Sequence, residues 1–166
     1  MLWSGCAGVI SKDVLKEVNR KITFGDLRKD TLAYLGETVL LGGVVVKVIY
    51  ELDHTLLELY QTEMDWEKRP ENLDRSEGRF LAQYDGFLDS EIYQKGRSVT
   101  VAGIVQGVKT MKLGETDYRY PFLIIRGIHL WEKEKPLAYD PYPWYPIGPW
   151  GRWGPWGPWY YPYWRY

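Results

Sequence analysis

The sequence contains 166 residues, of which 45% are apolar, and its 21 basic and 22 acidic residues give a net charge of −1. This length accommodates one domain and its ends, and the apolar fraction is sufficient for a hydrophobic core. The balanced charge excludes a large surface field of one sign and predicts no nucleic-acid partner. A run of about 18 apolar residues, which a membrane-spanning helix needs, does not occur. Cys6 is the only cysteine, which excludes an internal disulfide and a cysteine-cluster metal site.

Residues 1–6 have features of a lipoprotein signal. Ser4 and Gly5 directly precede Cys6, an arrangement that resembles the end of a bacterial lipoprotein signal, whose cleavage leaves a lipid-modified cysteine as the first residue. Trp3 stands where that pattern prefers an aliphatic residue, and residues 1–5 contain neither the charged nor the apolar region of such a signal. Two interpretations stay open: either the translation start lies upstream of Met1, or Cys6 is a free thiol near an unstructured end.

Residues 7–35 are predicted to form an N-terminal helical arm. Apolar residues recur at helical spacing, at Val14, Leu15, Val18 and Ile22. Ser11 suits the N-cap, so the pattern predicts an amphipathic helix over residues 11–22. Its basic polar face also fits a membrane-surface helix, although a docked segment is the commoner arrangement. Thr23 and Asp26 have the spacing of a capping box that opens one or two further helical turns.

Residues 36–135 are predicted to form the main domain. Runs rich in Val, Ile, Leu and Tyr predict five strands, over residues 36–51, 54–62, 78–84, 97–112 and 117–131. Gly42 and Gly43 lie within the first strand, where they permit a sharp bend or bulge. Residues 63–77 are predicted to form a polar loop, and residues 89–94 one helical turn that ends at Gly96.

The first and fourth predicted strands have similar patterns. Each is long and carries a glycine at its expected bend, Gly43 in one and Gly103 in the other. Two bent strands, three shorter ones and a helical turn between the third and fourth match an all-β, OB-type barrel of five strands. A small antiparallel sandwich is the alternative. By analogy with OB folds, a ligand is expected on the face across the two bent strands and at the mouth beside residues 86–89.

Residues 136–166 form a tail of different composition. They contain eight of the ten prolines and six of the nine tryptophans, so a regular helix or central strand is excluded and irregular structure is expected. One interpretation is a disordered tail. The other is contact with lipid headgroups, or with the sugar rings of cell wall or lipopolysaccharide, because exposed aromatic faces favour such partners. The candidate contact residues are Trp150, Trp153, Trp156, Trp159, Tyr160, Tyr161 and Trp164.

Enzymatic residues are not apparent in the sequence. His54 and His129, the only histidines, lie on different predicted strands, so we expect no metal site and no cofactor. The acidic residues between Glu63 and Glu77 are expected to be a solvated loop instead of a general acid and base pair. We therefore expect a protein that is not an enzyme.

Ordered motifs along the chain carry a family resemblance. They are Thr23-Phe24, Asp26-Leu27-Arg28, Gly36 with Gly42-Gly43, Arg75-Ser76-Glu77-Gly78-Arg79-Phe80-Leu81, Gly86-Phe87-Leu88-Asp89, Tyr93, Gly96-Arg97, Val99-Thr100-Val101-Ala102-Gly103, Tyr120-Pro121 and His129-Leu130-Trp131. Over residues 22–132 the chain resembles the Slp family of outer-membrane lipoproteins, of the starvation-inducible type. Asp30-Thr31 departs from the family, in which a proline often follows the acidic residue.

The resemblance implies a periplasm-facing lipoprotein anchored by a lipidated cysteine, which by position is Cys6. Ala7 is not an aspartate, so the usual sorting of such proteins implies the outer membrane. It implies a structural or binding module whose ligand is unknown, and a gene start upstream of Met1. The alternative is an OB-type protein without a lipid anchor that binds nucleic acid or carbohydrate. The oligomeric state is not predicted.

Overall fold

A computed structural model describes residues 10–72 and 74–133. The chain divides into two compact units, Met1–Lys133 and Glu134–Tyr166, and the described residues all belong to the first. Cys6, residues 1–9 and the aromatic tail therefore lie outside the described residues. None of the helices within the described ranges is long and apolar enough to cross a membrane.

The N-terminal arm contains three short helices, α1 (Lys12–Glu17), α2 (Phe24–Lys29) and the 3-10 helix η1 (Thr31–Tyr34). The capping box that opens α2 is confirmed, because Thr23 and Asp26 each bond the backbone of the other. Ser11 caps α1 as predicted. The helix ends at Glu17, earlier than the predicted residue 22, because Val18 is extended and the Asn19 amide donates to Thr38 O at 2.8 Å.

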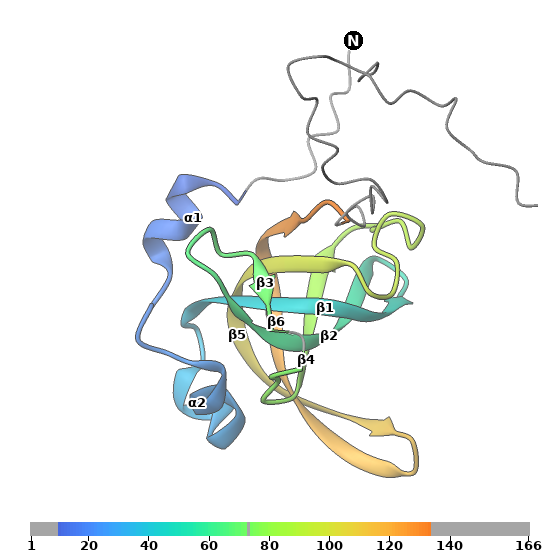
Figure 1. Cartoon of the computed structure of the whole chain (residues 1–166). Helices are drawn as coiled ribbons and strands as arrows, with labels where there is room; N and C mark the ends of the chain where they lie inside the picture. Colours follow the sequence, from blue (N-terminus) through green and yellow to red (C-terminus); the bar gives the residue numbers. More distant parts are fainter. Residues whose placement is uncertain (1–9, 73, 134–166) are drawn as a thin grey trace, which may run out of the picture. The chain divides into compact units, whose positions relative to one another are not determined.

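The strands form one closed barrel. They are β1 (Thr38–Tyr50), β2 (His54–Met64), β3 (Pro70–Glu71), β4 (Arg79–Asp85), β5 (Ser98–Leu113) and β6 (Thr116–Leu130). The sheet order is β1-β5-β6-β4-β2-β3, and an additional β1–β2 pairing closes the ring (Figure 1). All barrel pairs are antiparallel except β4–β6. This confirms the OB-type barrel of five strands, with β3 as a short extra strand, and excludes the open sandwich.

The middle of β1 explains how one strand closes the ring. Gly43 pairs with Gln61 of β2 on one side and with Val99 of β5 on the other. A Cβ on Gly43 would lie 2.9 Å from Tyr60 O, so only glycine permits this approach of β1 to β2. The bulge of β1 falls between Val45 and Lys47, two residues beyond the glycine pair. In β5, by contrast, Gly103 lies at a register shift, as expected.

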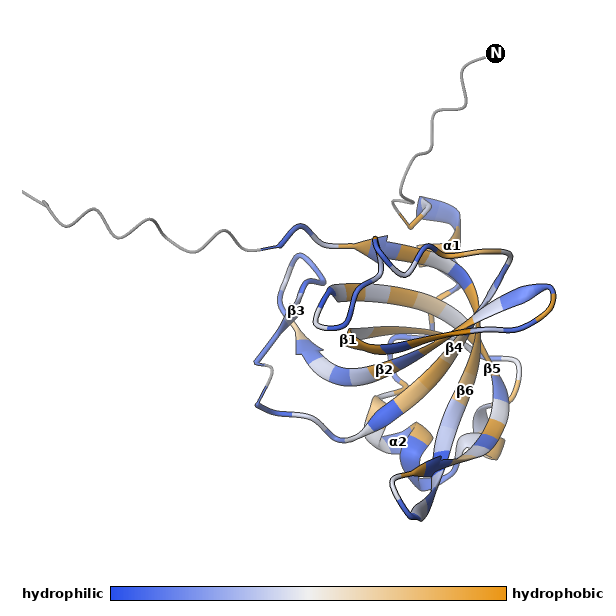
Figure 2. Cartoon of the chain, turned by 90° about the vertical axis from the view of Figure 1, so that its right-hand side faces the viewer, coloured by the Kyte–Doolittle hydropathy of each residue, from blue (hydrophilic) through white to orange (hydrophobic). Residues whose placement is uncertain are grey.

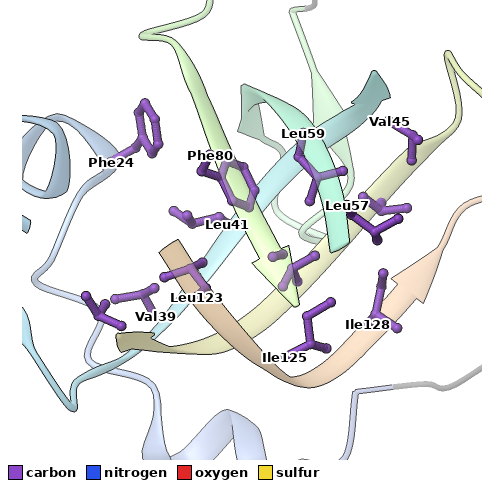
Figure 3. Packing of buried hydrophobic residues seen from close by; sticks show 14 of the residues in the cluster. Phe24, Val39, Leu41, Val45, Leu57, Leu59, Phe80, Leu123, Ile125 and Ile128 are labelled. Atoms are coloured by element: carbon purple, nitrogen blue, oxygen red, sulfur yellow. The ribbon is translucent and has the colours of Figure 1, made fainter. Parts of the chain in front are cut away.

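Alternating side chains of the strands fill the barrel. Figure 2 shows apolar and polar bands along the strands, and Figure 3 shows the buried cluster that they form. Its members from β2 and β4 are Leu57, Leu59, Phe80 and Ala82. Phe24 of α2 packs on Phe80 with ring centroids 5.9 Å apart. Burial of each large side chain contributes about 1.5–3 kcal/mol, so the core fixes which strand face points outward.

The β4–β5 connection contains the predicted helical turn. The Tyr93 amide donates to Asp89 O at 2.9 Å, and Gly96 ends the turn with a φ of 88°. Leu88 and Tyr93 from this connection join the core, each 7% exposed. The connection that includes residues 86–89 is therefore anchored to the barrel core by these two side chains.

Candidate ligand-binding site

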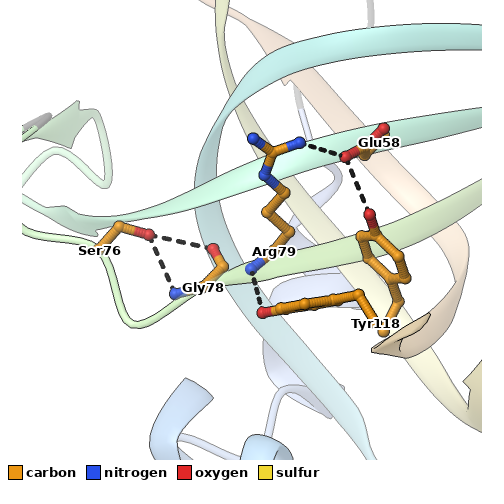
Figure 4. Close-up of polar contacts among 6 residues, drawn as sticks. Glu58, Ser76, Gly78, Arg79 and Tyr118 are labelled. Atoms are coloured by element: carbon orange, nitrogen blue, oxygen red, sulfur yellow. Dashed lines mark hydrogen bonds and ion pairs between the residues drawn. The ribbon is translucent and has the colours of Figure 1, made fainter. Parts of the chain in front are cut away.

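A charged pair lies on the outer face of β2 and β4. Arg79 Nη1 donates to Glu58 Oε1 at 2.6 Å, and Tyr120 Oη donates to the same oxygen at 3.2 Å (Figure 4). Glu58 points outward because its neighbours Leu57 and Leu59 point into the barrel. Glu58 as a whole residue is nevertheless only 7% exposed. The donors Arg79 and Tyr120 therefore replace the water that burial removes from its carboxylate.

Two groups of this network, Arg79 and Tyr120, keep their protons at neutral pH. The hydrogen bond to Glu58 raises the pKa of the Arg79 guanidinium. Burial raises the pKa of the Tyr120 phenol, and the negative charge of Glu58 raises it further. Arg79 therefore stays charged and Tyr120 stays protonated at neutral pH.

Apolar side chains surround the network on the same outer face. Leu56 and Leu81 are buried there with Tyr120, and partly buried side chains pack against them, namely Ile49, Met111, Tyr118 and Phe122. The rings of Tyr118 and Tyr120 are tilted, with centroids 4.6 Å apart. The outer face of β2, β4 and β6 is thus a second, smaller packed layer that holds Tyr118 in place.

A cleft of about 430 Å³ lies next to this layer. It is lined by Arg28, Tyr60, Ser76, Glu77, Gly78, Tyr118 and Arg119. The Arg79 amide donates to Tyr118 Oη at 3.1 Å, which ties the cleft to the network. Gly78 has a φ of 142°, and a Cβ there would lie 2.5 Å from Tyr118 Oη. Glycine is therefore required where the chain passes the tyrosine.

The loop before β4 is held by its own hydrogen bonds. Ser76 Oγ accepts from the Gly78 amide and donates to Gly78 O, both at 3.0 Å. The Arg28 guanidinium donates to Glu77 O. The Glu77 amide donates to Gln61 Oε1 at 3.1 Å. These bonds fix the shape of the cleft before any ligand arrives, which lowers the entropic cost of binding.

The cleft presents cationic and aromatic groups. Arg28 and Arg119 are exposed, and a guanidinium binds carboxylate or phosphate through paired donors. Tyr60 and Tyr118 add ring faces and hydroxyls, which suit sugars. The Ser76 hydroxyl is engaged with Gly78, and no histidine is among the lining residues.

The two histidines lie apart from this cleft. His54 is the first residue of β2, with Nδ1 2.7 Å from Asp53 Oδ1 and Nε2 3.0 Å from Glu51 Oε2. The hydrogen bond with His54 lowers the pKa of Asp53. His129 packs edge-on against Trp131, with ring centroids 4.4 Å apart. Within residues 10–72 and 74–133, the acidic and histidine side chains form no group of three that could hold a metal ion.

The predicted and observed site residues differ. Cys6 and the tail residues Trp150, Trp153, Trp156, Trp159, Tyr160, Tyr161 and Trp164 lie outside the described residues. The site residues predicted from the sequence did not include Glu58, Arg79, Tyr118 or Arg119. The run Arg75 to Leu81 did carry the family resemblance, and the alternation along residues 54–60 could have placed Glu58 on the outer face.

The strands form a small OB-type barrel with an arginine- and tyrosine-lined cleft on its outer face. A family model described as the outer membrane lipoprotein Slp family matches residues 3–165. The chain belongs to this family of outer-membrane lipoproteins.

Individual relatives agree with the family match. The uncharacterized lipoprotein YeaY of Escherichia coli K12 is 33% identical over 110 residues, which cover 66% of this chain and 56% of YeaY. The outer membrane protein Slp of the same organism is 32% identical over 98 residues, covering 59% and 52% of the two chains. An uncharacterized protein of Haemophilus influenzae is 28% identical over 109 residues, covering 65% and 59%. The chain thus spans about half the length of these curated relatives.

Proposed function

We propose that this chain is a periplasm-facing binding module of the outer membrane, attached by lipid at Cys6. Membership in a family of outer-membrane lipoproteins supports the attachment, since Cys6 is the only cysteine and falls within the matched residues 3–165. One acyl chain holds a protein only marginally, whereas several chains on one cysteine hold it stably. A Cys6→Ser variant should therefore leave the membrane fraction.

The observation that supports a binding role is the cleft lined by α2, β2, β6 and the loop before β4. OB folds bind ligands across their second and third barrel strands, which here are β2 and β4. Tyr60 of β2 and Gly78, directly before β4, line the cleft, and Arg28 and Arg119 outnumber Glu77 among its charged residues. We infer that its ligand is an anionic glycan of the envelope, in which carboxylates or phosphates meet the arginines and sugar rings meet the tyrosines.

Binding of soluble cell-wall fragments and of lipopolysaccharide, each titrated separately against the full chain, tests this role. Arg119→Ser should weaken binding of the true ligand class by about tenfold, as expected for loss of a charge-assisted hydrogen bond. Arg126→Ser is the matched control, because Arg126 is an exposed arginine of the same strand that does not line the cleft. Equal binding by both variants would contradict the assignment of this cleft.

Orientation has its own experiment. A protease added to intact cells should leave a periplasm-facing protein uncut, and should cut it after the outer membrane is permeabilised. Cleavage in intact cells would place the barrel on the outer surface. The glycan-binding result and the orientation result are independent, so either part of the proposal can fail alone.

A further inference from the structure

A second cleft, of about 340 Å³, lies between the N-terminal arm, the first half of β1 and the last residues of β2. It shares no lining residue with the arginine- and tyrosine-lined cleft. Its walls are mostly apolar: Leu15, Val18 and Ile22 come from the arm, and Leu40 and Met64 come from the barrel. Ligand pockets in proteins have this character and begin at about this size.

The helix that covers this second cleft is not packed down on the barrel. Leu15 and Val18 line the cleft, yet α1 has no buried residue. The arm is held just beyond the helix, where the Asn19 amide donates to Thr38 O at 2.8 Å and Asn19 Nδ2 donates to Glu37 Oε2 at 3.0 Å. The apolar face of α1 is thus held over the cleft and not against the barrel core. Its apolar area is therefore available to a ligand.

The floor of the second cleft contains a polar group without a partner. Thr62 is 1% exposed, and its Oγ1 makes no hydrogen bond within the described residues. A buried hydroxyl in a folded protein normally has a partner. Met64 lies beside it and fills the space over Gly42, where a Cβ would lie 2.5 Å from Met64 Cγ. Methionine is the most adaptable apolar side chain, so this part of the floor can adjust to an occupant.

The rim of the second cleft carries two cations. Lys68 is half-buried and Arg20 is exposed, and neither side chain makes an ion pair within the described ranges. Glu63 is the one carboxylate among the residues that line this cleft, and its Oε2 accepts a hydrogen bond from Asn72 Nδ2 at 3.1 Å. It therefore pairs with Asn72 and not with Lys68 or Arg20. A half-buried lysine without a carboxylate partner favours an anion at this end of the cleft.

We propose that the second cleft binds a single acyl chain with an anionic head. The chain lies against Leu15, Val18 and Met64, because burying its methylenes is the main source of affinity. The head meets Lys68 and Arg20, and the Thr62 hydroxyl donates to one of its oxygens. This inference concerns a surface separate from the glycan cleft, and it does not depend on lipidation of Cys6.

Displacement of fluorescent parinaric acid from the unlipidated full chain tests the proposal. Laurate and lauryl phosphate should both displace the probe, and the tighter of the two identifies the head as carboxylate or phosphate. Lauryl alcohol and dodecyltrimethylammonium should bind about tenfold more weakly or worse, because they lose the charge-assisted contacts. Displacement that ignores head charge, or no binding at all, would overturn the proposal.

Variants with matched controls locate the binding. Leu15→Trp fills the cleft and should abolish laurate binding, whereas Val14→Trp on the same helix should not. Lys68→Gln should weaken laurate binding about tenfold, whereas Lys95→Gln should leave it unchanged, because Lys95 is exposed and does not line the cleft. If Leu15→Trp and Lys68→Gln both bind laurate like the parent chain, the acyl chain lies elsewhere and the proposal fails.

Thr62→Val separates a binding role from a structural one. Replacing an unpartnered buried hydroxyl by a methyl group of similar shape should keep or raise the denaturation midpoint. The same variant should weaken laurate binding several-fold, because the head loses a donor. A lowered midpoint with unchanged laurate affinity would mean that the hydroxyl serves the fold, and would remove Thr62 from the proposal.

Discussion

Glu58 and Arg79 form an ion pair across β2 and β4, with Glu58 Oε1 2.6 Å from Arg79 Nη1 and the Glu58 side chain only 10% exposed. The backbone amide of Arg79 also donates to Tyr118 Oη at 3.1 Å, and Tyr118 lines the candidate glycan cleft. The residue that pairs with Glu58 is therefore also in contact with the wall of the cleft.

Removal of Glu58 should destabilise the protein strongly. Glu58→Ala leaves Arg79 partly buried without its carboxylate, and we expect a loss of about 3 kcal/mol in the free energy of unfolding, at the lower end for buried pairs because Arg79 is 29% exposed. Asp117→Ala is the control. It breaks the Lys112–Asp117 pair, which is 69% and 66% exposed, and should cost less than about 1 kcal/mol. Similar losses of unfolding free energy in urea titrations of the two variants would contradict this prediction, because the buried Glu58 pair would then stabilise the protein no more than an exposed pair does.

Ionisation of Tyr120 should destabilise the folded protein at alkaline pH. Burial, and secondarily the charge of Glu58, raises its pKa above the unfolded value of about 10. A group whose folded pKa is raised contributes stability that is fully present below the unfolded pKa and is lost as pH rises through the folded pKa. The denaturation midpoint should therefore fall above about pH 10, and the fall should be shallower in Tyr120→Phe. Tyr93 should contribute to the fall that remains in Tyr120→Phe, because burial raises its pKa as well. An unchanged pH profile in Tyr120→Phe would contradict this account.

Gly43 should tolerate no side chain. Gly43→Ala places a Cβ 2.9 Å from Tyr60 O, a backbone atom held in the β1–β2 pairing, so we expect a loss of about 1–3 kcal/mol. Gly25→Ala is the matched control inside α2, where the nearest atom, Glu77 Oε2, lies at 3.1 Å at the end of an exposed side chain that can move. That variant should be neutral or stabilising by up to about 1 kcal/mol. Thermal denaturation of both variants checks the contrast.

The tail tryptophans should contact lipid headgroups or sugars. Tryptophan emission should shift to the blue when the full chain meets lipid vesicles, because the rings leave water. Replacing Trp150, Trp153, Trp156, Trp159 and Trp164 by serine should remove the shift, whereas Trp66→Phe, at an exposed site on the barrel unit, should keep it. A shift with soluble cell-wall or lipopolysaccharide sugars but not with vesicles would favour sugar stacking. No shift with either would contradict both forms of the prediction.

Much of the fold could be predicted from the sequence, because its signals are local. The capping box at Thr23 and Asp26 needs only two side chains three residues apart. Gly114, with a φ of 64°, lies in the β5–β6 turn, in a left-handed conformation that glycine adopts readily. Pro121 lies in β6 close to the register shift between Val105 and Gly107, as expected for a proline within a strand.

The candidate sites could not be predicted in the same way, because they depend on long-range register. Glu58 and Arg79 are 21 residues apart, and Tyr120 is 62 residues from Glu58. Only the closed barrel brings their strands together. The position of the β1 bulge was also missed, because it lies between Val45 and Lys47, where no glycine or proline marks it. The β-branched residues around this bulge favour a regular strand equally at each position, so they do not mark where the bulge falls.

Attachment of this outer-membrane lipoprotein at Cys6 can be tested by the intact mass of its N-terminal peptide. The peptide should be prepared from protein isolated from its native membrane fraction. We predict that Cys6 is the first residue and that its mass includes diacylglycerol. A peptide that retains Met1, with Cys6 as a free thiol, would contradict the claim.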